Sequence, residues 1–421
     1  MTKNSRLGTM MFLQYALWGA WLPVTARYLS ASISEGGLGF TGSQIGMILG
    51  LAGSIGAIAA PFIAGQIADR YFSTEKILAF LVTIGGMVKW YTALQTDYKS
   101  WLVLSILYSV LYMPTLALSN SITFAHIDDQ ENDFPRIRVW GTIGWIASSW
   151  IFPMFWLQTD LKFQLLPPFF VGMEYPDVTS RLADALRLSG LISIFYGAFC
   201  FMLPNTPPSK NSVDKSAYIK AFKLFKEKSF SILVFTSLLV SVIHQIYFLQ
   251  TGPFLSSLGV ADSLIGPVMS IGQFAEILTM AVLGYFLNHL GFKKVISIGV
   301  FAYFLRYLIF GTSSLPLWII ISSQAFHGFC YAFFFAAAFI YVDKISENDF
   351  RHSAQTVFGI IILGGGPVLG GWLSGYLQST FSTNNVLDFS QFWYSVSIVG
   401  LVATIIFFTL FNDHLTKKEI I

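Results

Sequence analysis

The sequence predicts an all-α polytopic membrane protein with twelve transmembrane helices in two pseudo-symmetric six-helix bundles. Hydrophobic residues make up 54% of the chain and charged residues only 11%, less than half of the roughly 25% typical of soluble domains. The mean hydropathy is +0.64, which is too apolar for a water-soluble globule of this size. The 421 residues also leave about 35 residues for each of twelve segments, enough for a span of roughly 20 residues and a short loop.

Twelve apolar windows follow one another along the chain. Each is long enough for a membrane helix, and each is longer than the roughly ten residues of a transmembrane strand. The windows cover residues 8–29, 44–66, 77–95, 101–124, 137–157, 182–203, 230–250, 264–288, 295–312, 315–342, 354–378 and 391–411.

The distribution of basic residues predicts the orientation of these spans. When both termini are placed in the cytoplasm, most loop lysines and arginines lie on the cytoplasmic side, as the positive-inside rule requires. The opposite loops then keep little beyond Lys99, Lys162 and Arg181. We therefore expect a multi-pass protein of the cell inner (plasma) membrane that retains its first apolar segment.

Composition argues against several other classes of protein. The net charge is only +3, and the basic residues form no recognition surface, so we expect no nucleic-acid partner. Cys200 and Cys330 both lie in apolar runs, which indicates neither a disulfide framework nor a metal cluster. Because the six histidines are scattered and no paired carboxylates stand at a span end, a membrane-embedded transferase is a remote alternative. We expect no catalytic residues, no metal and no cofactor.

A polar linker divides the chain into two halves. Residues 204–229 form the only extended polar stretch, and 216–228 have the spacing of an amphipathic surface helix. We interpret this helix as a cytoplasmic tether resting on anionic membrane lipid, with a specific docking site as the alternative. The expected domains are a six-helix bundle at 1–203, the linker, and a second six-helix bundle at 230–421.

An internal repeat supports this division. Gly65-Gln-Ile-Ala-Asp69-Arg70 follows span two, and Gly284-Tyr-Phe-Leu-Asn288 follows span eight, the equivalent place in the second half. Both strings carry a glycine, a polar residue four positions later, and then basic residues. Duplicated bundles of this type place a substrate site between the halves, near the bilayer midplane.

These strings, with several others, resemble a known family. The loop after span two is the hallmark of the major facilitator superfamily. The string Asp133-Phe-Pro-Arg-Ile-Arg-Val-Trp-Gly-Thr-Ile-Gly144, which opens span five, is similar to the nucleoside:proton symporter family of bacterial nucleoside permeases, and Leu17–Trp21, Tyr112–Leu116 and Gly272–Glu276 extend the likeness. The resemblance covers essentially the whole chain. It implies the major facilitator fold, proton-coupled nucleoside uptake by alternating access, and a monomer.

The resemblance also gives roles to the charged loop after span two. In the superfamily this loop is a conformational latch, in which charge pairs and helix-end dipoles hold one access state closed. The residues that match it here are Asp69, Arg70 and Lys76.

Span eight carries the most informative ionisable group. Glu276 is the only carboxylate deep within a predicted span, and Gln273 lies one turn before it on the same helix face. An ionised side chain at mid-membrane costs at least about 2.5–3.5 kcal/mol, so its presence indicates a function. We predict that Glu276 couples transport to protons and that both residues bind substrate. A structural glutamate paired with a helix neighbour is the alternative.

One stripe of span five combines three polar or aromatic groups. Arg138, Thr142 and Trp145 are spaced i, i+4 and i+7, so they share a helix face. A guanidinium, a hydroxyl and an indole together suit a polar ligand that contains a ring. Alternatively, Arg138 extends to the cytoplasmic boundary. The family equivalents line the nucleoside cavity, so the resemblance favours substrate binding.

Span one repeats the arrangement. Gln14, Trp18 and Trp21 share a stripe, and we predict that Gln14 and Trp18 face the substrate cavity. We assign Trp21 to the aromatic belt at the membrane interface.

Two further spans carry residues that the resemblance singles out. In span seven, Gln245 matches a substrate-binding glutamine of the family, and Phe248 stands where one branch has a polar amide. In span ten, Ala332 occupies a position where members often carry an aspartate, which shifts proton coupling toward Glu276. Phe248 and Ala332 make the site less polar than nucleosides would require. A proton-coupled transporter of a sugar or sugar derivative with the same fold is therefore the alternative function.

Two intramembrane cations occupy corresponding places in the halves, Lys89 in span three and Arg306 in span nine. Such residues are functional candidates by default. We favour a packing role, in which they hold the two halves together through hydrogen bonds to carbonyls. We interpret His327 in span ten as an interior histidine with satisfied hydrogen bonds.

Overall fold

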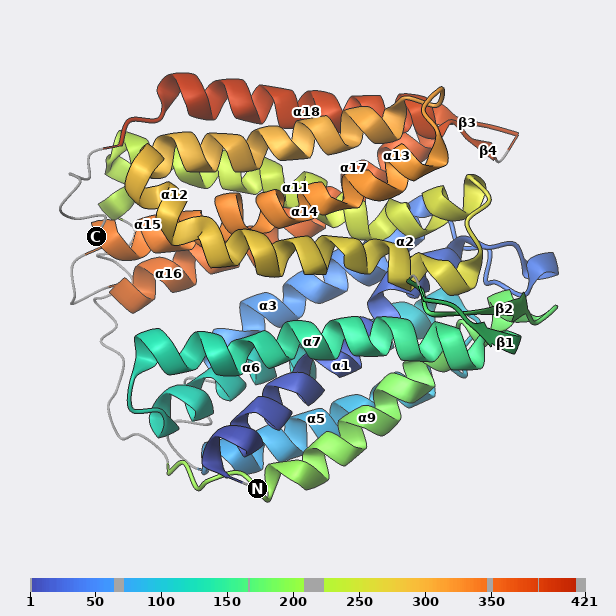
Figure 1. Cartoon of the computed structure of the whole chain (residues 1–421), viewed down its shortest axis with the longest axis horizontal. Coiled ribbons are helices and arrows are strands. Elements are labelled where there is room, and N and C mark those ends of the chain that lie inside the picture. Colours follow the sequence, from blue (N-terminus) through green and yellow to red (C-terminus); the bar gives the residue numbers. More distant parts are fainter. Residues whose placement is uncertain are drawn as a thin grey trace. The chain divides into compact units, whose positions relative to one another are not determined.

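The computed structural model describes residues 2–63, 72–165, 167–207, 223–346, 351–384 and 386–413. Each predicted apolar window overlaps a helix (Figure 1). Eight helices among the described residues are long and apolar enough to cross a membrane. In the amino-terminal part of the chain the helices are α1 (Lys3–Ser30), α2 (Gly42–Gly46), α3 (Ala52–Phe62), α5 (Thr74–Thr92), α6 (Tyr98–His126), α7 (Gln130–Trp156), α8 (Val178–Arg181) and α9 (Asp184–Cys200).

The carboxy-terminal part is also helical. One helix, α12, contains two predicted spans, which meet at a bend at Gly291. The φ of Gly291 is 76°, a value that glycine adopts readily but that lies outside the α-helical range. A π-helical segment, η6 (Cys330–Ala336), continues from α14. The helices are α11 (Lys228–Ser257), α12 (Asp262–Gly311), α13 (Leu317–Ser322), α14 (Phe326–Phe329), α15 (Ala337–Ile345), α16 (Arg351–Ile360), α17 (Gly366–Phe381) and α18 (Phe389–Leu410).

Polar side chains at the helix ends show why the helices begin where they do. The Asp97 carboxylate accepts a hydrogen bond from the backbone N–H of Ser100, 2.9 Å away, and so caps α6. The same bond lowers the pKa of Asp97. Asp388 caps α18 in the same way, through the N–H of Gln391.

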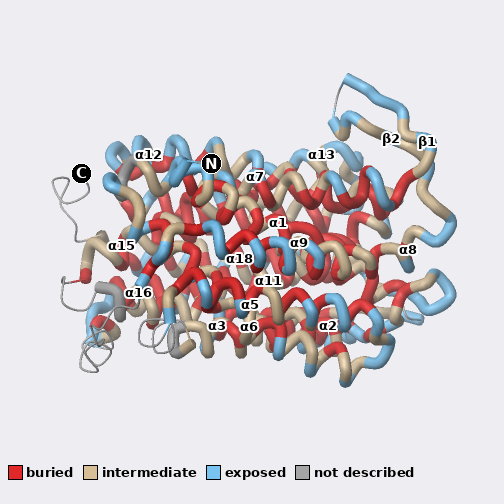
Figure 2. The backbone as a smooth tube through the Cα atoms, turned by 90° about the horizontal axis from the view of Figure 1, so that it is seen from below, coloured by how far each residue is buried: buried red, intermediate tan, exposed pale blue. Residues whose placement is uncertain are grey.

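Two short antiparallel hairpins join helices. Strand β1 (Gln158–Phe163) pairs with β2 (Phe170–Glu174), with Gln158 opposite Glu174. Strand β3 (Ser382–Thr383) pairs with β4 (Val386–Leu387). The β1–β2 hairpin is largely exposed, whereas buried residues concentrate along the helices (Figure 2). Neither hairpin was predicted from the sequence, because both lie between apolar windows.

The contacts group the chain into two compact units. The first unit contains the described residues of 1–211 together with Phe248–Val268, and the second contains those of 212–247 and 269–421. The boundary therefore crosses α11 after Tyr247 and α12 after Val268. The end of α11 and the start of α12 belong to the first unit, although the sequence analysis expected all of 230–421 in one bundle.

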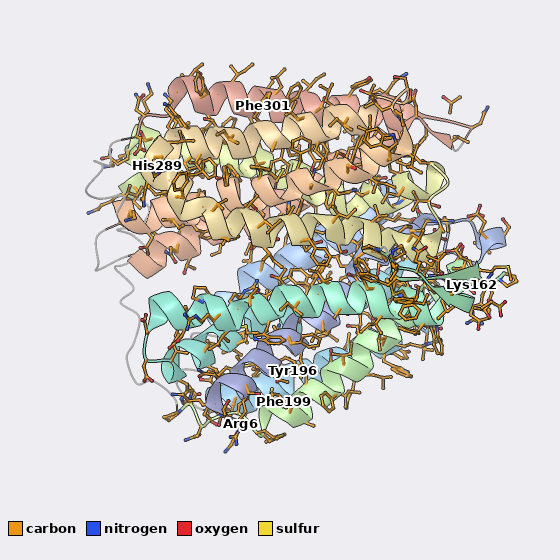
Figure 3. The ribbon with its side chains drawn as sticks, in the orientation of Figure 1. Arg6, Lys162, Tyr196, Phe199, His289 and Phe301 are labelled. Atoms are coloured by element: carbon orange, nitrogen blue, oxygen red, sulfur yellow. The ribbon has the colours of Figure 1, made fainter. Side chains whose placement is uncertain are left out.

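In the first unit, α1 packs against α7 and α9, and α5 packs against α6 and α9. Figure 3 shows Arg6 at one end of this unit and Lys162 on the β1–β2 hairpin at the other. Arg6 donates a hydrogen bond to the carbonyl of Met202, 3.0 Å away. Buried residues such as Trp101 and Tyr196 fill the core.

Part of the predicted latch and linker cannot be followed. Asp69 and Arg70, like residues 208–222 of the linker, lie outside the described residues. Lys76 is exposed in the first turn of α5.

Candidate functional site

In the first unit, the predicted binding residues of α1 and α7 lie against each other. The ring of Trp18 meets that of Trp145 edge-on at 5.6 Å and that of Tyr112 at 5.5 Å. The two helices approach closely, because a Cβ added at Gly19 would lie 2.6 Å from the carbonyl oxygen of Trp145. An aromatic cluster of Trp18, Tyr112 and Trp145 is therefore built from three helices.

Arg138 lies on the same face of α7 as Trp145. Its guanidinium carbon is 4.0 Å from the ring centroid of Tyr15, which lies one turn before Trp18 on α1. Arg138 and Thr142 are both half-buried. The predicted stripe of span five is thus a real face, because its first and last members both contact α1.

Gln14 is fully buried in this structure. Its amide nitrogen donates to the hydroxyl of Thr115 at 2.8 Å, and the Tyr112 hydroxyl donates to its backbone carbonyl at 3.0 Å. Its side-chain oxygen has no hydrogen-bond partner among the described residues. Gln14 therefore connects α1 to α6, partly through Tyr112 of the aromatic cluster, and its predicted contact with substrate stays a prediction.

In the second unit, Gln273 and Glu276 lie on one face of α12. Gln273 is 8% exposed, and its side-chain oxygen has no hydrogen-bond partner among the described residues. Glu276 is half-buried. An unsatisfied buried acceptor requires an explanation, and a donor group of a ligand supplies one. Gln245, in α11, is also half-buried.

Two residues that the resemblance singled out are placed differently from these. Phe248 is half-buried and lies one turn after Gln245 on α11, where the chain passes into the first unit. Ala332 is fully buried within the π-helical segment.

The structure corrects the predictions for Trp21 and the two intramembrane cations. Trp21 is only 7% exposed, and the ammonium nitrogen of Lys89 lies 3.4 Å from its ring centroid. The assignment of Trp21 to the interface belt is therefore wrong, because the ring serves a buried cation. Arg306 donates to His327 and Tyr307 rather than to carbonyls. Among the described residues, both cations contact side chains rather than carbonyls, so the predicted hydrogen bonds to carbonyls are wrong for these contacts, whereas a packing role between the halves stays a prediction.

One charged cluster in the first unit was missed by sequence reasoning. The Arg27 Nε donates to the Asp262 carboxylate at 2.9 Å, and Thr179 donates to the other carboxylate oxygen at 3.3 Å. Glu174 accepts a hydrogen bond from the backbone N–H of Ser263 at 2.6 Å. These bonds tie the start of α12 to α1, α8 and β2. The available signal was one charge of each sign at the ends of spans one and eight, but 235 residues separate them.

Comparison with known proteins covers nearly the whole chain. The sequence profile of the family described as nucleoside H+ symporter matches residues 1–416. The transporter YegT of Escherichia coli (strain K12) is 32% identical over 98% of this chain and 95% of its own length. The nucleoside permease NupG of the same organism is 27% identical over 98% of this chain and 96% of its own length.

Solved structures agree with these relatives. The crystal structure of the nucleoside transporter NupG matches with a TM-score of 0.82 and 26% identity, covering 98% of this chain and 100% of that one. The D-xylose-proton symporter matches with a TM-score of 0.72 at 13% identity over 98% of both chains, which shows a shared fold alone. The predicted major facilitator fold and the prediction of a transporter rather than an enzyme are confirmed.

Proposed function

Because this chain belongs to the nucleoside H+ symporter family, we propose that it is a secondary transporter that takes up nucleosides together with protons by alternating access. The family match and the multi-pass helical structure support this proposal. The chain is a multi-pass membrane protein. We further propose an inner-membrane location with both termini in the cytoplasm, because this orientation places most loop lysines and arginines on the cytoplasmic side.

The observation that carries the proposal is the face of α12 that presents Gln273 and Glu276. A buried amide oxygen without a partner suits a hydroxyl or amino donor of a nucleoside, and the half-buried carboxylate one turn later suits a proton. On α1 and α7, Trp18 and Trp145 offer aromatic faces for a base, and Arg138 with Thr142 offers donors for its polar edge. Gln14, Gln245 and Phe248 complete the proposed binding set.

Substitution of the carboxylate tests the coupling role. Glu276→Gln removes the titratable proton but keeps a side chain of similar shape, so we expect uphill uptake of labelled uridine in proteoliposomes to fall at least about tenfold, while exchange of internal for external uridine persists. Glu227→Gln, which changes an exposed carboxylate near the end of the linker, is the matched control and should behave as the native chain does. Normal pH-driven accumulation by Glu276→Gln would exclude this role for Glu276.

A sugar or sugar derivative is the second candidate substrate. The apolar side chains of Phe248 and Ala332 favour it, because a nucleoside base offers more groups to bind than these positions can satisfy. Competition of labelled uridine uptake by panels of unlabelled nucleosides and sugars separates the two. Competition by nucleosides and not by sugars is expected, and the reverse result would replace nucleosides with sugars as the cargo.

A further inference from the structure

A buried polar cluster lies in the second unit, around Arg306. Arg306 is 0% exposed, and its guanidinium donates to His327 Nδ1 at 3.1 Å and to the Tyr307 hydroxyl at 3.0 Å. No described carboxylate pairs with it. The Tyr247 ring lies against the guanidinium, with 4.2 Å between ring centroid and guanidinium carbon. A charge in this environment is costly, so the contacts that it makes need a function.

Arg306 fixes the imidazole of His327. Because a guanidinium can only donate, the Nδ1 of His327 accepts and carries no proton, so this ring is neutral. The imidazole also stacks on the ring of His244, with centroids 5.6 Å apart, and on that of Tyr247, with centroids 5.5 Å apart. The ring is therefore held at one edge by a hydrogen bond and by stacking on α11. The guanidinium fork sets its rotation, because two parallel rings alone would let it turn within its own plane.

His327 in turn lies directly against the helix turn that carries the proposed binding residues. A Cβ added at Gly272 would lie 2.8 Å from the Cβ and 3.1 Å from the Cγ of His327, so the backbone of Gly272 lies directly against the His327 side chain. A Cβ added at Gly328 would lie 2.5 Å from the carbonyl carbon of Ala275 and 2.9 Å from the nitrogen of Glu276. With no soft side chain between α14 and this turn of α12, a displacement of His327 moves the backbone of Gln273 and Glu276.

We infer that Arg306, acting through His327, is a positioning residue that fixes the substrate-binding face of α12; this inference rests on the proposed function. Arg306 is 0% exposed, so it acts through its neighbours and not by binding substrate itself. It holds His327 in one orientation, and the glycine contacts at 272 and 328 transmit that orientation to Gln273 and Glu276. His244 stacks on the same imidazole and directly precedes Gln245. The ring of His327 therefore also contacts the turn of α11 that carries Gln245.

The first measurement needs no substrate. In a Gln273→Cys protein, the rate of labelling by N-ethylmaleimide reports how far this face is protected, and the two native cysteines are buried and give a low background. Adding Arg306→Gln should raise the labelling rate by about fivefold, because the turn loses its fixed contact. Gly328→Ala, which keeps Arg306 but separates the backbones, should do the same. Lys89→Met, which removes the buried cation of the first unit, should leave the rate unchanged.

The second measurement is a double-mutant cycle on the equilibrium binding of uridine to the detergent-solubilised full chain. Arg306→Gln and His327→Phe should each raise the Kd by about tenfold, and the double variant should be no weaker than the weaker single variant, because both act through one ring. Arg306→Lys keeps the charge without the fork and should give an intermediate Kd.

The outcomes separate this inference from the proposed function. Labelling at position 273 that does not change in folded Arg306→Gln and Gly328→Ala proteins would overturn the positioning role, as would independent, additive effects on Kd. A native chain that binds no nucleoside, while labelling at position 273 still responds to Arg306→Gln, would overturn the proposed function and leave the positioning role standing.

Discussion

Among the described residues, each of the two units buries one cation, and the surroundings of the two cations differ. In the first unit, the ammonium of Lys89 lies between the rings of Trp21 and Tyr108, 3.4 and 3.9 Å from their centroids, and Tyr108 stacks on Tyr112. In the second, Arg306 is held by directed hydrogen bonds as well as by rings.

This difference shows that a buried charge can be enclosed by rings without a directed bond, or can orient the groups that accept hydrogen bonds from it. An ammonium is a compact point charge that an aromatic cage can surround without any fixed direction. A guanidinium is a planar fork, and its fixed geometry orients the groups that accept from it. The first unit therefore encloses its cation, whereas the second unit uses its cation to order a polar cluster.

The largest expected effect comes from removing each cation in turn. Arg306→Met removes the two charge-assisted hydrogen bonds that His327 Nδ1 and the Tyr307 hydroxyl accept, although the Tyr307 hydroxyl still donates to the Ile243 carbonyl, so we expect a loss of about 3 kcal/mol in the free energy of unfolding. Lys89→Met removes a cation–π contact together with the cost of burying the charge, and should change stability by less than about 1 kcal/mol. Unfolding in mixed detergent micelles measures both. Equal losses in the free energy of unfolding would show that the two cations contribute equally to stability.

A smaller effect is expected from breaking the cage of Lys89. Trp21→Leu removes the nearer ring, which leaves a buried ammonium less compensated, and should cost about 2 kcal/mol beyond the lost packing. Lys89→Met in the same chain should recover that part, because no charge then needs the ring. Absence of this recovery would show that Trp21 stabilises the unit by packing alone. The same unfolding assay applies.

The smallest effect is expected at the ion pair between Arg27 and Asp262. Asp262→Asn weakens a largely buried bond to Arg27, where the side chains are 16% and 6% exposed, and should cost about 1.5 kcal/mol. Asp177→Asn is the matched control, because it weakens the exposed pair with Arg181 and should cost under about 0.5 kcal/mol. Thermal unfolding of the two variants provides the comparison. If Asp177→Asn lost as much stability as Asp262→Asn, burial would not determine how much these ion pairs stabilise the protein.

Local pattern was sufficient for the helices and for the faces they present. All twelve apolar windows overlap helices, and the stripe from Arg138 to Trp145 does lie against α1. Both features depend on spacing within one segment, which the sequence displays directly. Gln273 and Glu276 share a helix face for the same reason.

Local pattern failed where the partner comes from another segment. Trp21 is a residue type that is common at the membrane interface, yet its ring lies against the ammonium of Lys89, which comes 68 positions later in the chain. No local pattern in the sequence links Arg27 to Asp262. The two residues pair because α1 and the start of α12 pack in one unit. Nor does the spacing of spans seven and eight indicate that their junction packs with the first unit.

The sequence by itself determined that this chain is a multi-pass helical transporter of a known family, because hydropathy, helical period and local strings are properties of single segments. Only the tertiary structure decided which aromatic rings enclose Lys89, and that Arg306 holds His327 against the turn bearing Glu276. The physical reason is that a buried charge takes whatever donors, acceptors and rings the packed helices bring within a few ångströms, and packing brings together residues that the sequence keeps far apart.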